Sequence, residues 1–239
     1  MTPAPADPAQ FADQVAAVCA VYAAAPVLET LGIHVLSTDA MTGIQALERA
    51  APTLPMQPGQ VERREFEYVR HGTRSLIANF QVATGQVIAP SLGPTRTEAD
   101  FAAHIAQTVA ADPAANYLFL VDNLNTHQSE SLVRLVAEWE GYSGDLGVKG
   151  ESGILASMAS RAAFLSDPAR WIQFVSLPKH ASWLNQIELW FSILVRRLLK
   201  RASFTSTEDL RERILAFIAY FNRHAKPFRW TYTGRHLRA

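Results

Sequence analysis

Apolar residues recur every three or four positions in several long stretches of the chain, as they do on one face of an α-helix. In residues 97–109, for example, Phe101, Ile105 and Val109 share a face. Ser206 followed by Asp209 is typical of a capping box at the start of another such stretch. The pattern predicts helices at residues 10–22, 97–109, 131–139, 154–165, 184–200 and 207–221.

Shorter apolar or alternating runs predict strands between these helices. The expected strands are residues 33–38, 44–48, 64–69, 76–83, 87–89, 117–121 and 171–176. The runs 64–69 and 76–83 alternate enough to predict an antiparallel pair with a turn near His71 and Gly72. Loops are expected at the proline-containing residues 51–59 and the glycine-rich residues 141–153. Strands followed by a helix, a strand and more helices indicate a mixed α/β domain.

One acid interrupts the apolar stripe of the helix predicted from Leu184 onward. At about 100° per residue, Ile187, Phe191 and Val195 fall within roughly 60° of Leu184, and Glu188 falls at roughly 40°. An unpaired carboxylate in that stripe would be costly, so we expect it to be neutral, paired or metal-bound. An ion pair with a nearby arginine is an open alternative.

Two further acids, Asp39 and Asp122, each directly follow a predicted apolar strand. Carboxylates at strand ends that face a cleft are natural ligands for Mg²⁺, which prefers oxygen donors. With Glu188 from a following helix, three carboxylates would converge and could hold a pair of ions that drive phosphoryl transfer. Each aspartate has an ordinary alternative role as a turn former or helix cap.

Composition bounds the class of protein. The 239 residues suit one large domain or two small ones, and 49% hydrophobic content is ordinary for a globular enzyme. Cys19 is the single cysteine, which excludes an internal disulfide framework and a cysteine-based zinc site and favours a reducing, cytosolic setting. No apolar run is expected to span a membrane, and the first residues lack the basic start of a secretory signal.

The net charge is zero, but its distribution is uneven. Residues 171–239 hold 12 Lys and Arg against 4 Asp and Glu, so this third carries +8 and the rest carries −8. A basic third suggests a polyanion partner. Its densest patch is Arg196, Arg197, Lys200 and Arg201. The alternative is a solvated helix end whose cations interact with the helix dipole.

Long ordered motifs then point to a family. Residues 118–127 read LFLVDNLNTH, residues 178–191 contain SWLNQIE, and residues 37–48 read STDAMTGIQALE. They resemble the second-aspartate, third-acid and first-aspartate motifs of bacterial insertion-sequence DDE transposases of the Tc/mariner superfamily. Residues 67–73 and 220–232 are also similar, so the resemblance runs from about Phe11 to the C-terminus.

This resemblance implies a ribonuclease H-like mixed sheet flanked by helices, with Asp39, Asp122 and Glu188 as catalytic and metal-binding acids. It implies Mg²⁺ or Mn²⁺, with two ions, and DNA partners: the transposon ends and the target. Hydrolysis at the transposon end would free a 3′-hydroxyl that attacks target DNA in line, without a covalent protein–DNA intermediate. Four matching motif residues would hold the acids or contact DNA: Asn123, His127, Ser182 and Asn185. A homodimer and a bacterial, nucleoid-associated cytoplasmic location are expected.

Departures from the family pattern define an alternative. Ala40 stands where relatives commonly carry an acid, and the 66-residue interval from Asp122 to Glu188 is long, which suggests an insertion at about residues 141–168. We expect a linker helix in residues 1–30 and a catalytic domain in residues 31–239, with no room for upstream helix-turn-helix modules. The alternative function is therefore a non-catalytic DNA-binding or dimerising remnant. A ribonuclease H-like nuclease with another substrate is less favoured, because the matched motifs are those of transposition.

Overall fold

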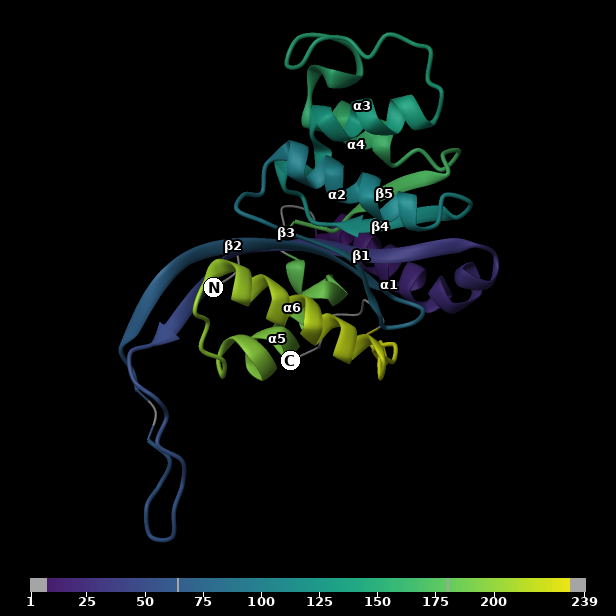
Figure 1. Cartoon of the computed structure of the whole chain (residues 1–239). Helices are drawn as coiled ribbons and strands as arrows, with labels where there is room; N and C mark the ends of the chain where they lie inside the picture. The colour runs from purple at the N-terminus through teal and green to yellow at the C-terminus, as the bar shows by residue number, and fades with distance from the viewer. Residues whose placement is uncertain (1–7, 64, 180, 233–239) are drawn as a thin grey trace.

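The computed structural model describes residues 8–63, 65–179 and 181–232, and a five-stranded mixed sheet is its centre (Figure 1). The strand order is β3-β2-β1-β4-β5. β1 pairs antiparallel with β2 and parallel with β4, while β2–β3 is antiparallel and β4–β5 parallel. The bounds are β1 Ile33–Arg49, β2 Tyr68–Gln81, β3 Val87–Gly93, β4 Asn116–Val121 and β5 Ile172–Ser176. The predicted mixed α/β class is confirmed.

Helices cover both faces of this sheet, because the side chains of adjacent β1 residues pack into hydrophobic cores on opposite faces. Leu36 packs with α2, α3 and α4, whereas its neighbour Val35 packs with α1 on the other face. α5 and α6 cover the outer part of that second face, around Phe80 and Trp190. The helix bounds are α1 Pro8–Thr30, α2 Glu98–Ala111, α3 Glu130–Trp139, α4 Met158–Leu165, α5 Gln186–Leu194 and α6 Thr207–Asn222.

The two central strands are longer than the sequence predicts. β1 does not end before Asp39 but continues to Arg49 through a register irregularity beside Gly43, so the strand expected at residues 44–48 is its second half. The turn predicted at His71-Gly72 is wrong, since β2 runs straight through it. Gly72, at φ 121°, lies instead at a bulge between two stretches of β1–β2 pairing. Long-range pairing therefore overrides the local turn signal.

An extended arm, of which the structure describes residues 50–63 and 65–67, connects β1 to β2 and projects from the body (Figure 1). Isolated bridges pair Leu54 with Arg63 and Gln57 with Gln60, so the predicted loop at residues 51–59 is one side of a narrow hairpin. The large apolar side chains of its described residues are exposed, with Phe66 at 82%. Little of the arm is therefore stabilised by the rest of this chain.

α1 is 23 residues long, well beyond the predicted residues 10–22. By length and composition alone α1 is long and apolar enough to cross a membrane. This corrects the expectation that the chain has no apolar run of that length. Its inner side is nevertheless occupied, because Val15, Val18 and Tyr22 are buried against β1, β4 and the turn before α5. The division of the chain at residue 30 stays a prediction.

The ends of other helices also differ from those predicted. The helix expected at residues 154–165 divides into a 3₁₀ turn, η2 (Gly153–Ala156), and α4, where Ser157 forms a capping box. The helix expected at residues 184–200 begins only at Gln186 and ends in a π-helical turn, η4 (Val195–Leu199). At α6 half of the predicted capping box forms: Ser206 accepts from the Asp209 backbone N–H, but the Asp209 carboxylate accepts from Thr205.

Candidate metal centre

Parallel pairing of β1 with β4 brings Asp39 and Asp122 together. The pairing runs from Ile33 to Ser37 on β1, and Asp122 directly follows the end of β4. The prediction that Asp39 directly follows its own strand is therefore wrong. Asp39 lies within β1, beside the point where the parallel neighbour β4 ends. It is 5% exposed, and Asp122 is half-buried. The geometry places both carboxyls at one edge of the parallel half of the sheet.

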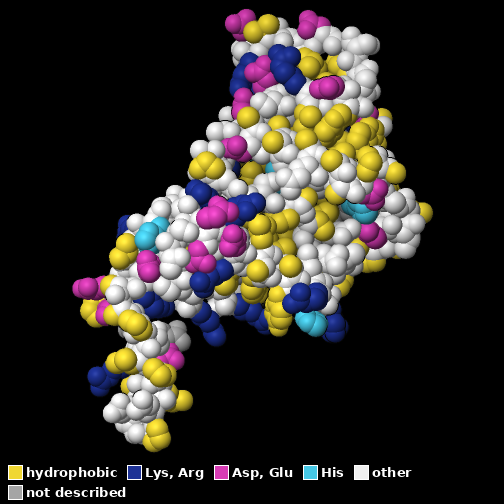
Figure 2. Space-filling view, viewed as in Figure 1, with side chains coloured by type: hydrophobic (Ala, Val, Ile, Leu, Met, Phe, Trp, Pro, Cys, Tyr) yellow, Lys and Arg dark blue, Asp and Glu magenta, His cyan; other side chains and the backbone are white. Residues whose placement is uncertain are grey.

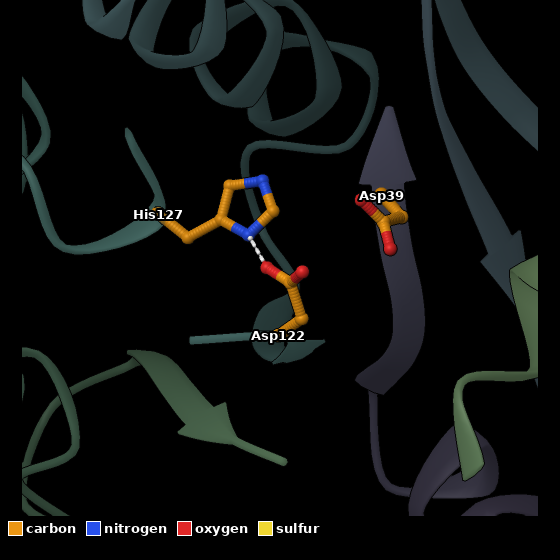
Figure 3. A group of neighbouring side chains, drawn as sticks. All are labelled: Asp39, Asp122 and His127. Atoms are coloured by element: carbon orange, nitrogen blue, oxygen red, sulfur yellow. Dashed lines mark ion pairs between the residues drawn. The ribbon is translucent and has the colours of Figure 1, made fainter. Parts of the chain in front are cut away.

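A buried histidine lies near both aspartates and contacts Asp122 (Figure 3). His127 lies in η1 (Asn125–Gln128), the 3₁₀ turn after Asp122, and its Nδ1 is 2.7 Å from Asp122 Oδ1. Ligand-type atoms of Asp39, Asp122 and His127 all lie within 4.8 Å of one another. Asp122 Oδ1 also accepts from the Leu124 backbone N–H at 3.0 Å, so the aspartate shapes its turn while facing the cluster.

Glu188, in the first turn of α5, lies beside Asp39 but outside the group whose ligand atoms are within 4.8 Å of one another. The buried side of α5 is formed by Ile187, Trp190, Phe191 and Leu194, which puts Glu188 roughly 110° from its centre. The expectation that Glu188 lies inside the apolar stripe is therefore wrong: it is half-buried at the stripe's edge. Burial, the charge of Asp39, a hydrogen bond with Asp39 and the charge of Asp122 raise its pKa to about 7. Within the described residues, no arginine forms an ion pair with Glu188.

The pKa values of the two aspartates are shifted in opposite directions. Burial and the charge of Asp122 raise the pKa of Asp39, against the Ala40 backbone N–H and His127. Burial also acts to raise the pKa of Asp122, but the contact with His127, its charge and the Leu124 backbone N–H hold it below its ordinary value. Three crowded carboxyls with oxygen donors and mutual repulsion fit a divalent cation such as Mg²⁺ or Mn²⁺.

Asn185 fastens the start of α5 to β1. This fully buried residue donates to the Thr38 carbonyl at 3.2 Å and to Asp39 Oδ2 at 3.3 Å. Its amide oxygen accepts from the Ser37 hydroxyl, which in turn accepts from the Ile187 backbone N–H at 2.9 Å. Sequence reasoning missed Ser37, although its position two residues before Asp39 puts both on one face of the strand. These bonds dock the helix that carries Glu188.

The other predicted residues lie in different settings. Asn123 donates to the Leu177 carbonyl and so ties the turn after Asp122 to the chain leaving β5. Ser182 is exposed in η3 (Ser182–Leu184), and its side chain contacts none of the three acids in the part of the chain that the structure describes. His180, which belongs to the motif around Glu188, lies outside the described residues.

The basic patch is exposed but lies beyond α5 rather than among the acids. Arg196 and Arg197 are in η4, and Lys200 and Arg201 follow it. There the Phe204 backbone N–H binds the Leu47 carbonyl, so the patch borders the second half of β1. Figure 2 shows Lys and Arg side chains along the lower margin of the body, on the side of the sheet that α5 and α6 cover.

Comparison with known proteins identifies the family and the fold. Residues 34–211 match the family model described as DDE superfamily endonuclease. The catalytic domain of the Mos1 mariner transposase superposes with a TM-score of 0.52 at 10% identity, covering all of both chains. The Mos1 mariner paired end complex with Mn gives 0.52 at 13% identity, over 92% of this chain and 57% of that one. A search of curated proteins gives no match. The likeness confirms the expected ribonuclease H-like fold, and the chain spans little more than half of the Mos1 protein in that complex.

Proposed function

The chain belongs to the DDE superfamily of endonucleases, and we propose that it is a transposase catalytic domain that cleaves and joins DNA strands with Asp39, Asp122 and Glu188. The observation that carries the proposal is the gathering of these acids from β1, β4 and α5, with Glu188 raised to a pKa of about 7 by burial and by its two neighbours. Such perturbed acids mark functional sites. Nicking of a DNA duplex in Mg²⁺ or Mn²⁺ tests it, and intact DNA at every metal concentration would contradict it.

Each acid would contribute carboxylate oxygens to a divalent cation, and we propose two ions. When bound, such ions activate the attacking oxygen and stabilise the leaving oxygen of an in-line displacement. His127 would orient the Asp122 carboxylate through its 2.7 Å contact, and Asn185 would hold Asp39 through its amide. The Mos1 complexes with Mn, and with Mn and Raltegravir, support the choice of metal by likeness of fold.

Two features bear on the non-catalytic alternative. Ala40, which replaces the acid common in relatives, packs partly buried against the core beneath α2, so it fills an apolar position. A remnant without chemistry would have no reason to keep three carboxyls crowded against their own repulsion. The geometry therefore favours catalysis.

We propose DNA as the partner, both transposon ends and target, and the basic patch as part of its binding surface. Changing Arg196, Arg197, Lys200 and Arg201 to glutamine should weaken duplex binding and flatten the plot of log affinity against log salt by about 0.9 for each phosphate that the variant no longer binds. A control is glutamine at Arg134 and Lys149, which are exposed and ion-paired on the far side of the sheet. An unaltered slope in the patch variant would mean that these cations belong to a solvated helix end and do not bind DNA phosphates. The expected homodimer stays a prediction.

A further inference from the structure

A buried arginine without a carboxylate partner lies close to the acid cluster. Arg161, on α4, is 5% exposed, and no acid forms an ion pair with it in the described ranges. Its guanidinium donates instead to the Gln128 carbonyl at 2.6 Å, the Leu155 carbonyl at 3.0 Å and Asn125 Oδ1 at 3.4 Å. A buried cation is costly unless it is well hydrogen-bonded, so these three oxygens explain its stability there.

The oxygens that Arg161 binds belong to two short helical turns. Asn125 and Gln128 are the first and last residues of η1, and Leu155 lies near the end of η2. Gln128 and Leu155 contribute backbone carbonyls, which lack partners within their turns, and Asn125 contributes its side-chain oxygen. The planar guanidinium reaches several of them at once, which the single ammonium of lysine cannot do. Arg161 thus clamps η1 from the side of α4.

The clamped turn carries His127. The opposite side of the same turn is fixed by Gln128, whose amide donates to the Ser176 hydroxyl at 2.9 Å, at the end of β5. The Phe101 ring packs over the His127 ring, with centroids 4.3 Å apart. His127 is therefore held from three directions with its Nδ1 against Asp122. A shift of η1 would move the imidazole and leave the Leu124 backbone N–H as the remaining described hydrogen bond that orients the Asp122 carboxylate.

We propose that Arg161 is a positioning residue for the metal centre: by clamping η1 it fixes His127 and, through it, the orientation of Asp122. The inference rests on the proposed function, because it assumes that Asp122 binds metal. It also gives a role to the segment at residues 141–168, which the sequence marks only as an insertion. That segment would support the site from outside rather than touch substrate.

The test measures binding of Mn²⁺ alone to the full chain, from the electron paramagnetic resonance signal of free Mn²⁺, without DNA. The variants are Arg161→Met, which removes all three bonds, and Arg161→Lys, which keeps the charge. The matched control is Arg170→Met: this neighbouring arginine is also largely buried, but it stacks on Phe164 and does not bind η1. Thermal unfolding of each variant confirms that binding is measured on folded protein.

We expect Arg161→Met to weaken Mn²⁺ binding about 10- to 100-fold, as removal of a group that supports a metal ligand does elsewhere. The Mn²⁺ affinity of Arg161→Lys should lie between those of Arg161→Met and the wild type. If the methionine variant does not fold, the comparison of the lysine variant with the wild type tests the inference. Arg170→Met should bind as the wild type does. Equal affinity of the Arg161 variants and the Arg170 control would overturn the inference. Wild-type binding no tighter than that of Asp122→Asn would instead overturn the proposed function.

Discussion

Replacing Glu188 by glutamine should lower metal-dependent DNA nicking by about three orders of magnitude, roughly 4 kcal/mol of transition-state stabilisation. Glutamine keeps the shape of the side chain but removes the charge that would hold the cation. It also removes the repulsion from Asp39 and Asp122 that raises the pKa of Glu188, so the fold should not suffer. The measurement is the initial rate of nicking of a supercoiled plasmid in Mn²⁺.

Two companion variants sharpen this result. Glu188→Asp keeps a carboxylate on a shorter stem and should retain more activity than the glutamine variant. Glu212→Gln removes an exposed acid of α6, outside the acid cluster, and should nick like the wild type. Undiminished nicking by Glu188→Gln would remove Glu188 from the catalytic site.

Asn185→Leu should damage both the fold and the site. Leucine has a similar volume but leaves the Ser37 hydroxyl and the Thr38 carbonyl of β1 without their buried partner. We expect the free energy of unfolding to fall by about 2–4 kcal/mol, because buried polar groups left unsatisfied are costly. Nicking well below the unfolding temperature should fall a further 10- to 100-fold, since α5 would no longer hold Glu188 beside Asp39.

A matched asparagine separates these two effects. Asn222 exchanges two hydrogen bonds with the Val87 backbone, at 2.9 and 2.8 Å, and so fastens α6 to β3 as Asn185 fastens α5 to β1. Asn222→Leu should destabilise the fold without a specific loss of nicking. If both leucine variants lose activity only in proportion to stability, Asn185 has no special role in positioning the acids.

Local sequence patterns predicted most of the helices and strands. They failed where the extent of a strand depends on pairing with residues far away in the sequence. The period of α2 and the apolar run of β4 were sufficient, because each buries its own face within one short segment. The continuation of β1 past Asp39 depends on pairing with residues of β2 that are 19 to 37 positions away, which no local window contains. For the same reason Gly72, a turn signal by itself, occupies a bulge in a continuous strand.

The candidate acids could be named from the sequence, but the residues that position them could not. Strand ends and an acid on an apolar helix pointed to Asp39, Asp122 and Glu188. The stripe around Glu188 was misplaced because Trp190 and Leu194, rather than Val195, turned out to face the core. Arg161 carries no sequence signal at all: its role follows from the packing of α4 on η1, which only the folded chain reveals.

The central claim, that three mutually repelling carboxyls share one metal centre, is tested most directly by thermal unfolding of wild type and Glu188→Gln across pH, with and without Mn²⁺. The pKa of Glu188 is raised from 4.5 to about 7, so its contribution to stability is present below pH 4.5 and is lost as pH rises toward 7. Groups outside the acid cluster titrate alike in both proteins, so the difference between them reports Glu188 together with the Asp39 and Asp122 carboxyls coupled to it. Without metal, the stability of the glutamine variant relative to the wild type should therefore increase as pH rises through this window. Mn²⁺ at pH 7.5 should raise the wild-type midpoint far more than that of the variant, because only the wild type binds the ion tightly. Equal shifts with Mn²⁺ and a difference that does not change with pH would contradict the shared site.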